Sequence, residues 1–374
     1  MKDTKVLYKY GPLVFLLLYS SLSHAPLVLA ETSTQKMYFF LIRLADFIYA
    51  SKLRLCICLS ILLFITCSFT VSQSFAQSGP NVPIKIIVGA PAGGTTDTTA
   101  RIVANALGAQ LSRSVVVENR PGAGGNLAAE FVAQAHPDGN TLLMCFTSHA
   151  INATLYPHLN FNPIKDFTAL TLVASSPSVL VARPSLGIRD VNELIVYAKL
   201  HPGKLNFAIG ALGSSLHMAG EEFKMRAGVY IVNIPYKGTA PAVQDLLAGQ
   251  VELMFAALGN VQQHIKSGKL IALGVTSLKP IESLPNVAPI ALSIPGFESS
   301  AWFGLLGPAG MSSQVQQDLG QATRQALGMP DTRRKIEMEG ATVVASSGPE
   351  FTRFLASEVT RWGKIVAFSG AKPE

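Results

Sequence analysis

From Val82 onward, short apolar runs alternate with segments whose apolar positions recur every three or four residues. The short runs predict strands at 83–89, 115–118, 141–146, 168–174, 178–182, 205–208, 230–233, 251–255 and 270–276. The periodic segments predict helices at 96–111, 126–135, 190–200, 215–227, 239–248, 260–267, 312–327, 331–339 and 348–368. Several of the strand candidates are almost continuously apolar, which is typical of strands buried in parallel sheets. The alternation therefore predicts an α/β fold built from doubly wound sheets.

The pattern changes twice along this body, near Arg183-Pro184-Ser185 and again over residues 299–308. Two such crossing points predict two lobes joined by a hinge, with the C-terminal segment completing the first lobe. The expected boundaries are 77–183 plus 305–374 for lobe 1 and 184–304 for lobe 2. A chain of 374 residues is long enough for two such domains. We expect a cleft between the lobes.

Residues 1–76 have the pattern of a leader. Lys52 and Arg54 precede an apolar run over 55–69, and Ser74-Phe75-Ala76 has the small-residue spacing of a signal-peptidase site. We therefore predict export, with cleavage after Ala76. Cys67 makes a lipid anchor a weaker alternative, because Thr66 before it is larger than the residue usually found there. A second apolar stretch over 13–30 leaves open an overextended start or an additional membrane segment.

Charge and cysteine usage narrow the possible functions. The chain carries a formal net charge of +7, but seven of its 30 basic residues and three of its 23 acidic residues lie within 1–76. The remainder has no basic run interleaved with aromatic residues, so nucleic-acid binding is not expected. Of the four cysteines only Cys145 lies outside the leader, which excludes a disulfide within the exported body. Its apolar neighbours predict a buried, inert thiol.

The most informative segment follows the first strand. Residues 90–94 read Ala-Pro-Ala-Gly-Gly and lead into Thr95, Thr96 and Asp97, which favour the start of a helix. Glycines let the backbone approach a ligand closely, and the first turn of a helix offers unpaired amides at the positive end of its dipole. This order predicts a site for an anion such as a small carboxylate, with Ala92, Gly93, Gly94 and Asp97 as candidate residues.

Similar loops follow other predicted strands. A second glycine-rich turn spans residues 119–126, and candidate binding residues after three further strands are Thr147, Ser148 and His149, then Ser214, Ser215 and His217, then Tyr236, Lys237, Gly238, Thr239 and Ala240. Each group alone is more typical of ordinary helix capping than of binding. Their repetition at the carboxyl ends of strands, where α/β sheets place ligands, favours a shared anion site.

Several other kinds of site are not supported. The glycine turns lack the third glycine of a dinucleotide fingerprint, and no phosphate-binding Gly-Lys-Ser or Gly-Lys-Thr follows them. Neither Ser148 with His149 nor Ser215 with His217 lies in a nucleophile elbow, so no catalytic residue is assigned and an exported hydrolase is only a remote alternative. Zinc and calcium motifs are absent outside the leader. We therefore expect no enzyme activity, metal or cofactor.

The ordered motifs resemble those of a known receptor family. They are Ile86 to Asp97, Val116 to Asn126, Pro137-Asp138-Gly139, Pro235 to Gly238 and Ala301 to Gly304. With the chain between them, they are similar to the periplasmic solute receptors of tripartite tricarboxylate transporters, the Bug or TctC-like family, over essentially all of residues 82–370.

This resemblance implies a type II Venus-flytrap protein that closes on a small carboxylate in the periplasm and delivers it to integral membrane permease subunits. The carboxylate, di- or tricarboxylic or aromatic, would be held by main-chain amides and small hydroxyls of the loops named above. A monomer is expected. A periplasmic sensor that presents the bound ligand to a signalling partner would share all of these features and stays an alternative.

Three positions depart from the family pattern. Ala256 stands where many relatives have an aspartate, Gly259 where proline is frequent, and Ala211 where glycine is frequent. The resemblance implies that loss of this acidic group removes a partner for a ligand amine or hydroxyl. The ligand is therefore expected to be a plain or aromatic carboxylate and not an amino acid.

Overall fold

The computed structural model describes residue 43 and residues 82–373. The predicted leader and its cleavage point at Ala76 lie outside the described residues. All of the elements described below lie within the unit Pro80–Glu374. Among the described residues, every helix is too short or too polar to cross a membrane.

The first sheet of this unit has six strands in the order β11-β4-β10-β3-β1-β2. They are β1 (Ile84–Val88), β2 (Val115–Asn119), β3 (Thr141–Phe146), β4 (Phe167–Ser176), β10 (Ala301–Pro308) and β11 (Thr342–Val343). Strand β1 is parallel to β2 and β3, whereas β10 is antiparallel to both β3 and β4, and β11 is antiparallel to β4. The sheet is therefore parallel where the predicted binding loops leave it.

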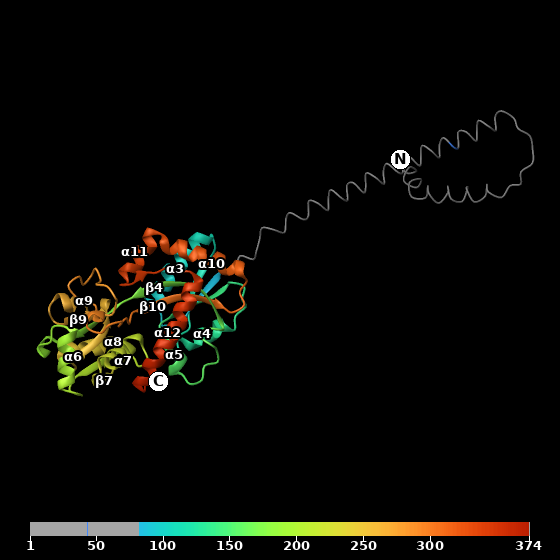
Figure 1. The fold of residues 1–374 in the computed structure, drawn as a ribbon. Coiled ribbons are helices and arrows are strands. Elements are labelled where there is room, and N and C mark those ends of the chain that lie inside the picture. The colour runs from blue at the N-terminus through green and yellow to red at the C-terminus, as the bar shows by residue number, and fades with distance from the viewer. Residues whose placement is uncertain (1–42, 44–81, 374) are drawn as a thin grey trace, which may run out of the picture. The chain divides into compact units, whose positions relative to one another are not determined.

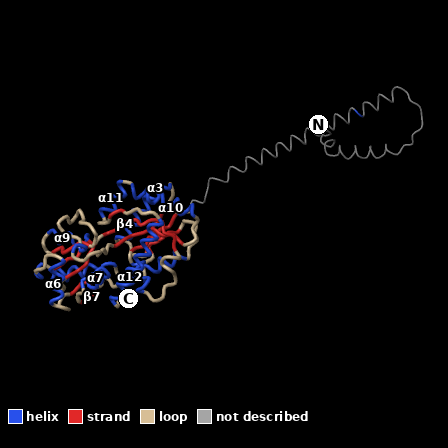
Figure 2. The backbone as a smooth tube through the Cα atoms, viewed as in Figure 1, coloured by secondary structure: helices blue, strands red, loops and turns tan. Residues whose placement is uncertain are grey.

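Helices cover both faces of this sheet, as Figures 1 and 2 show. They are α3 (Thr95–Leu111), α4 (Asn126–Ala133), α5 (Ser148–Leu155), α10 (Ser313–Gly328), α11 (Pro330–Met338) and α12 (Gly348–Ser369). One core contains residues of α3, α10 and α11, and the other contains residues of α4, α5 and α12. Burial on both faces explains why strands such as Ile84–Val88 are almost wholly apolar.

The second sheet has five strands in the order β7-β6-β8-β5-β9. They are β5 (Ser178–Ala182), β6 (Asn206–Ile209), β7 (Val232–Pro235), β8 (Leu253–Ala257) and β9 (Ile271–Val275). Its helices are α6 (Val191–Leu200), α7 (Ser215–Ala227), α8 (Thr239–Ala248) and α9 (Leu258–Lys266). Strand β6 is parallel to β7 and β8, and β5 is antiparallel to β8 and β9.

The chain passes between the sheets twice. It leaves the first sheet at Pro177, between β4 and β5, and returns over residues 276–300, before β10. The two passages lie side by side, because the amide of Ser178 donates to Thr276 Oγ1 at 2.8 Å and the amide of Ser299 donates to the carbonyl of Thr276 at 3.2 Å. The sequence predicts lobe boundaries at 183/184 and 304/305. In the structure, β5 lies before the first of these positions but belongs wholly to the second sheet, and β10 spans the second position but belongs wholly to the first sheet.

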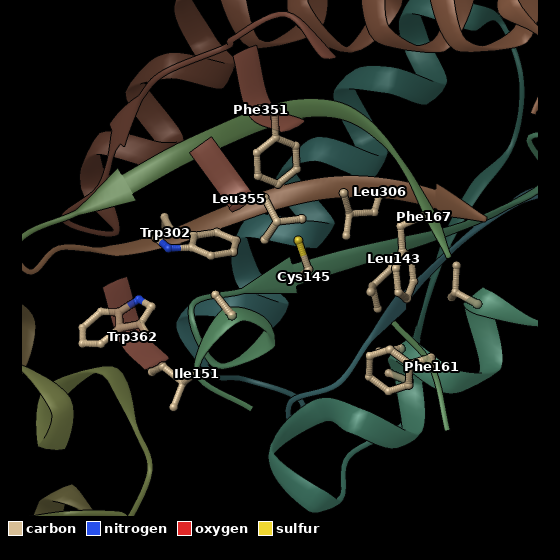
Figure 3. Close-up of a cluster of buried hydrophobic side chains, with 14 of the residues drawn as sticks. Leu143, Cys145, Ile151, Phe161, Phe167, Trp302, Leu306, Phe351, Leu355 and Trp362 are labelled. Carbon is tan, nitrogen blue, oxygen red and sulfur yellow. The ribbon is translucent and has the colours of Figure 1, made fainter. Parts of the chain in front are cut away.

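The core beneath α12 is rich in aromatic residues. Trp302, Phe351 and Leu355 surround the Cys145 side chain in Figure 3. The thiol is buried, as predicted, and contacts the carbonyl of Gly304 at 3.2 Å, and burial raises its pKa. Strand β10 needs glycine at position 304, since a Cβ there would lie 2.1 Å from the Phe351 ring. Glycine thus allows α12 to pack closely on the sheet.

Helix α7 of the second sheet packs against α12 of the first. Arg361 of α12 donates from Nη1 to Glu222 Oε2 of α7 at 2.7 Å and to the carbonyl of Glu298 at 2.9 Å. The same guanidinium pairs with Glu358, whose Oε2 accepts from both Trp302 Nε1 and Trp362 Nε1. Burial raises the pKa of the Glu222 carboxyl, although the Arg361 and Arg226 charges oppose this rise. The two sheets are therefore linked by the Arg361–Glu222 ion pair beside the return passage.

Each predicted helix and strand has a counterpart in the structure, and three further elements were not predicted as such. Helix α5 was not predicted, β10 was interpreted only as a boundary, and the short strand β11 was missed. Not every strand pairing is parallel, because β10 and β11 are antiparallel to their neighbours in the first sheet and β5 is antiparallel to β8 and β9 in the second. Strands β5 and β10 directly follow the two passages between sheets, where the chain enters a sheet without a crossover helix.

Candidate functional site

The first candidate loop joins β1 to α3. Ala92, Gly93 and Gly94 are exposed, and Gly94 is the N-cap of α3 in extended conformation, with no side chain capping the helix. The amides of the first helical turn have no acceptors within the helix, so this loop presents donors to its surroundings. A Cβ on Gly94 would meet only the carbonyl oxygen of Pro91, at 3.8 Å. The space in front of this loop is open.

Asp97 lies behind this loop and is 3% exposed. Its Oδ2 accepts from the Gly93 amide at 2.9 Å and from Arg101 Nε at 3.0 Å, and its Oδ1 accepts from Asn119 Nδ2 at 2.9 Å. Burial acts to raise the pKa of the Asp97 carboxyl, but the bonds from Arg101, Gly93 and Asn119 together lower it to about 2. Asp97 is thus a carboxylate whose acceptors are occupied by the protein itself.

The second glycine-rich turn is packed against the first loop. A Cβ on Gly89 would lie 2.6 Å from the Cα of Gly125, and one on Gly124 would lie 2.9 Å from Asn152 Nδ2. The Asn152 amide donates to the carbonyl of Gly124 at 3.1 Å and to Asn126 Oδ1 at 2.8 Å. Close backbone approach therefore explains these glycines without a ligand.

The third candidate group begins α5. Thr147 is buried and its Oγ1 accepts from the amide of Trp302 at 2.9 Å, while Ser148 is half-buried at the helix start. The His149 ring is buried between Phe161 and Phe167, and its Nε2 lies 2.9 Å from the carbonyl of Pro163. Burial lowers the pKa of His149 to about 4, so the ring is neutral at pH 7 and supplies no charge to an anion.

The corresponding loop of the second sheet joins β6 to α7. Ser214 is the N-cap, and its Oγ accepts from the amide of His217 and lies 2.8 Å from the carbonyl of Ala211. Ser215 is half-buried at the first helical position. The His217 ring is 4% exposed, and its Nδ1 accepts from the amide of Gly213 at 3.0 Å. Its Nε2 lies 3.4 Å from Glu221 Oε1.

The last candidate group joins β7 to α8. Gly238 has φ +112° and is the N-cap of α8, again without a side-chain cap, and Lys237 and Ala240 are exposed beside it. The Gly238 amide donates to the carbonyl of Gly210 at 2.9 Å, which links this loop to the loop after β6. Thr239 is the first residue of the helix. The Tyr236 hydroxyl donates to Asp245 Oδ2 at 2.9 Å, and burial together with this carboxylate raises its pKa to about 12.

These loops fall into two groups. The loops after β1, β2 and β3 lie at one edge of the first sheet, and those after β6 and β7 lie at one edge of the second, because parallel neighbours end at the same edge. Helix α5, which begins after β3, closely approaches the loop after β6, since a Cβ on Gly213 would lie 2.6 Å from Leu155 Cδ2. The side chains of Asp97, His149 and His217 are engaged inside the protein, whereas no side chain caps the first helical turns that follow Gly94 and Gly238.

The structure adds residues that sequence reasoning missed. Asn119 ends β2 and holds Asp97, and Asn233 in β7 donates to Glu221 Oε1 at 2.6 Å and lies 3.4 Å from His217 Nε2. Their signal in the sequence is an asparagine in the mainly apolar strand that follows each candidate helix. Ala256, one of the departures from the family pattern, is wholly buried in β8, and the ligand preference drawn from it stays a prediction.

Within the part of the chain that the structure describes, no group of three or more histidine, cysteine, aspartate or glutamate side chains could hold a metal ion. The candidate residues offer main-chain amides, small hydroxyls and the exposed cation of Lys237. Such a set binds an anion by hydrogen bonds and the fields of helix dipoles.

The chain is similar to known receptors in sequence and in fold. Residues 99–370 match the model of the tripartite tricarboxylate transporter family receptor, TctC. Protein BugT of Bordetella pertussis is 36% identical over 313 residues, which cover 83% of this chain and 96% of BugT.

Two solved structures are also similar. Rpa4515 of R. palustris, described with adipate, has a TM-score of 0.68 and 32% identity, covering 79% of this chain and all of that chain. MatC of Rhodopseudomonas palustris, described with bound malate, has a TM-score of 0.64 and 31% identity, covering 76% of this chain and 99% of that chain. The fold and family are those of periplasmic solute-binding receptors and not of enzymes. The chain belongs to the TctC family of receptors of tripartite tricarboxylate transporters.

Proposed function

We propose that this protein is an extracytoplasmic receptor that captures a small carboxylate and delivers it to the membrane permease of a tripartite tricarboxylate transporter. The observation that carries the proposal is the pair of uncapped helix starts at Gly94 and Gly238, one on each sheet, at the edges where parallel strands end. A dicarboxylate has two charged ends, and each sheet offers donors for one of them.

The proposed contacts follow the exposure of each group. In lobe 1 the ligand meets the backbone of Ala92 to Gly94 and the hydroxyl of Ser148. In lobe 2 it meets Ser214, Ser215 and the segment Lys237 to Ala240. The lobes correspond to the two sheets and close by a hinge at the paired passages near Ser178 and Thr276. Ligand contacts from both lobes would favour the closed state.

The ligand class is a plain di- or tricarboxylate or an aromatic acid. The described ligands of the similar structures, adipate and malate, support a carboxylate. Among the described residues, Asp97 and Glu221 behind these loops are both buried and paired within the protein. Neither carboxylate would therefore be free to pair with an ammonium group on the ligand. The proposal includes a monomeric receptor, exported to the periplasm with removal of residues 1–76.

The decisive variant is Gly94→Val. Gly94 has φ −83°, which a valine can adopt, and its side chain would extend into open space, so folding should be unaffected. The side chain would keep a ligand from the first-turn amides of α3. We expect the affinity for adipate or malate to fall at least a hundredfold, measured by calorimetric titration of protein purified from the periplasm.

The matched control is Gly328→Val, at the far end of α10. A Cβ on Gly328 would meet nothing within 4 Å, and α10 meets the C-terminal end of α3 through the Gln110–Gln325 bond of 2.7 Å. This control should bind like the wild type. If Gly94→Val also keeps wild-type affinity, the loop after β1 is not part of the site. If no di- or tricarboxylate or aromatic acid raises the melting temperature of the wild type, the proposed ligand class is wrong.

A further inference from the structure

The two candidate loops that precede α3 and α7 share one backbone device. In each, a glycine in the left-handed region lies two positions before the first helical residue, with φ +85° at Gly93 and +70° at Gly213. In each, the amide of that glycine donates to the side chain four residues later, Asp97 Oδ2 at 2.9 Å or His217 Nδ1 at 3.0 Å. The acceptor occupies the third position of the helix in both cases.

The partners of the two acceptors also correspond. Four residues further along the helix, Arg101 pairs with Asp97 at 3.0 Å and Glu221 lies 3.4 Å from His217 Nε2. The strand that follows each helix supplies an asparagine. Asn119 donates to Asp97 Oδ1 at 2.9 Å, and Asn233 lies 3.4 Å from His217 Nε2. The units β1–α3–β2 and β6–α7–β7 therefore hold their glycine loops with side chains from equivalent places.

The hydrogen bonds of His217 define the protonation of its ring nitrogens. Because the Gly213 amide donates to Nδ1, that nitrogen carries no hydrogen, and the Nε2 hydrogen is directed toward the Glu221 carboxylate. Glu221 is further held by Lys224 Nζ at 2.7 Å and Asn233 Nδ2 at 2.6 Å. These bonds fix the ring in the orientation that accepts from the loop.

We propose that Asp97 and His217 are paired positioning residues: each holds its glycine loop so that the neighbouring amides are presented to the ligand, and neither touches the ligand itself. This inference rests on the proposed function for the identity of the ligand, but the ordering of the loops is independent of it. A ligand contact would compete for acceptors that Gly93 and Gly213 already occupy. A carboxylate at Asp97 would also repel a carboxylate ligand.

His217 allows a specific test, because one substitution can keep the contact made by Nδ1 and another can keep the contact made by Nε2. In His217→Asn, the amide oxygen can take the place of Nδ1 and accept from Gly213, while the contact to Glu221 is lost. In His217→Gln, the longer side chain reaches toward Glu221 and leaves Gly213 without its acceptor. Glu221 keeps Lys224 and Asn233 in both variants, so both should fold.

Two readouts are needed. Hydrogen exchange of the Gly213 amide, followed by NMR of protein labelled with ¹⁵N-glycine and purified from the periplasm, reports the loop. Calorimetric titration with adipate and malate reports binding. We expect His217→Gln to speed Gly213 exchange and to weaken binding, each about tenfold, and His217→Asn to stay within about threefold of the wild type in both.

The other outcomes separate the two proposals. If His217→Gln matches the wild type in exchange and affinity, His217 does not position the loop. If His217→Asn loses affinity while Gly213 exchange is unchanged, the ring touches the ligand, and the inference is overturned. If the wild type binds neither acid nor any other carboxylate, the proposed function fails, and Gly213 exchange alone still decides whether His217 orders the loop.

Discussion

The units β1–α3–β2 and β6–α7–β7 each hold a glycine amide with a side-chain acceptor, but the acceptors and their partners differ chemically. In the first, Asp97 is paired with Arg101, whose side chain is 49% exposed. In the second, His217 is paired with Glu221, whose side chain is 2% exposed and is neutralised by Lys224. The two acceptors are equally buried, but their partners differ in exposure. Asp97 is held by a half-exposed arginine, whereas His217 is held by a buried carboxylate.

The largest expected effect comes from removing the buried carboxylate that holds His217 in the unit β6–α7–β7. Glu221→Ala leaves the Lys224 ammonium without its carboxylate and His217 without its orienting partner. We expect a loss of about 3 to 5 kcal/mol in the free energy of unfolding, measured by urea denaturation. Arg101→Ala removes the corresponding partner at the exposed edge and should cost less than about 1 kcal/mol. Equal losses in the two variants would contradict the contrast between the loops.

A second pair of variants compares the glycines themselves. Gly213→Ala places a Cβ 2.6 Å from Leu155 Cδ2 and requires alanine at φ +70°, so it combines a clash with backbone strain. Gly93→Ala requires φ +85° but meets nothing within 4 Å. We expect destabilisation of about 2 to 3 kcal/mol for the first variant and about 1 kcal/mol for the second, from thermal unfolding. A more stable Gly213→Ala would show that α5 does not pack on this loop.

Acid should release the first loop through Asp97. The folded-state pKa of Asp97 is about 2, below its ordinary value of 3.8, so its ionised form is favoured by folding. The resulting stability is fully present above about pH 4 and is lost as the pH falls toward 2. We expect Asp97→Asn to reduce the loss of unfolding free energy between pH 5 and pH 2 by about 2 kcal/mol. An unchanged pH dependence in this variant would mean that Asp97 is not selectively held in its charged form.

Much of this fold could be predicted from the sequence because most of its elements are locally specified. The apolar strand Ile84–Val88, its glycine turn and the helix from Thr95 follow one another in the chain, and each has a clear pattern. Strand β10 was missed because Gly304 and Gly307 interrupt its apolar run. Gly304 is required by Phe351, which comes from elsewhere in the chain, and Gly307 by Met311, four residues further on. Helix α5 has only eight residues, which is too short for a clear period.

The candidate site was predicted at the level of loops and less well at the level of side chains. The positions of Gly93, Gly94 and Gly238 follow from strand-to-helix turns that the sequence makes plain. The engagement of His149 between two aromatic rings depends on Phe161 and Phe167, which no local pattern connects to it. The support given by Asn119 and Asn233 also depends on strand pairing. Tertiary contacts of this kind decide whether a polar residue faces a ligand or the interior.

The central claim is that main-chain amides from both sheets receive the carboxylate. Its most direct test is a titration of ¹⁵N-glycine-labelled protein with adipate and with malate, following the amide resonances of Gly94 and Gly238, with Gly328 as an internal reference. We expect the resonances of Gly94 and Gly238 to shift together along one saturating curve for at least one acid, while that of Gly328 stays in place. Saturable binding that leaves both Gly94 and Gly238 unmoved would contradict the claim.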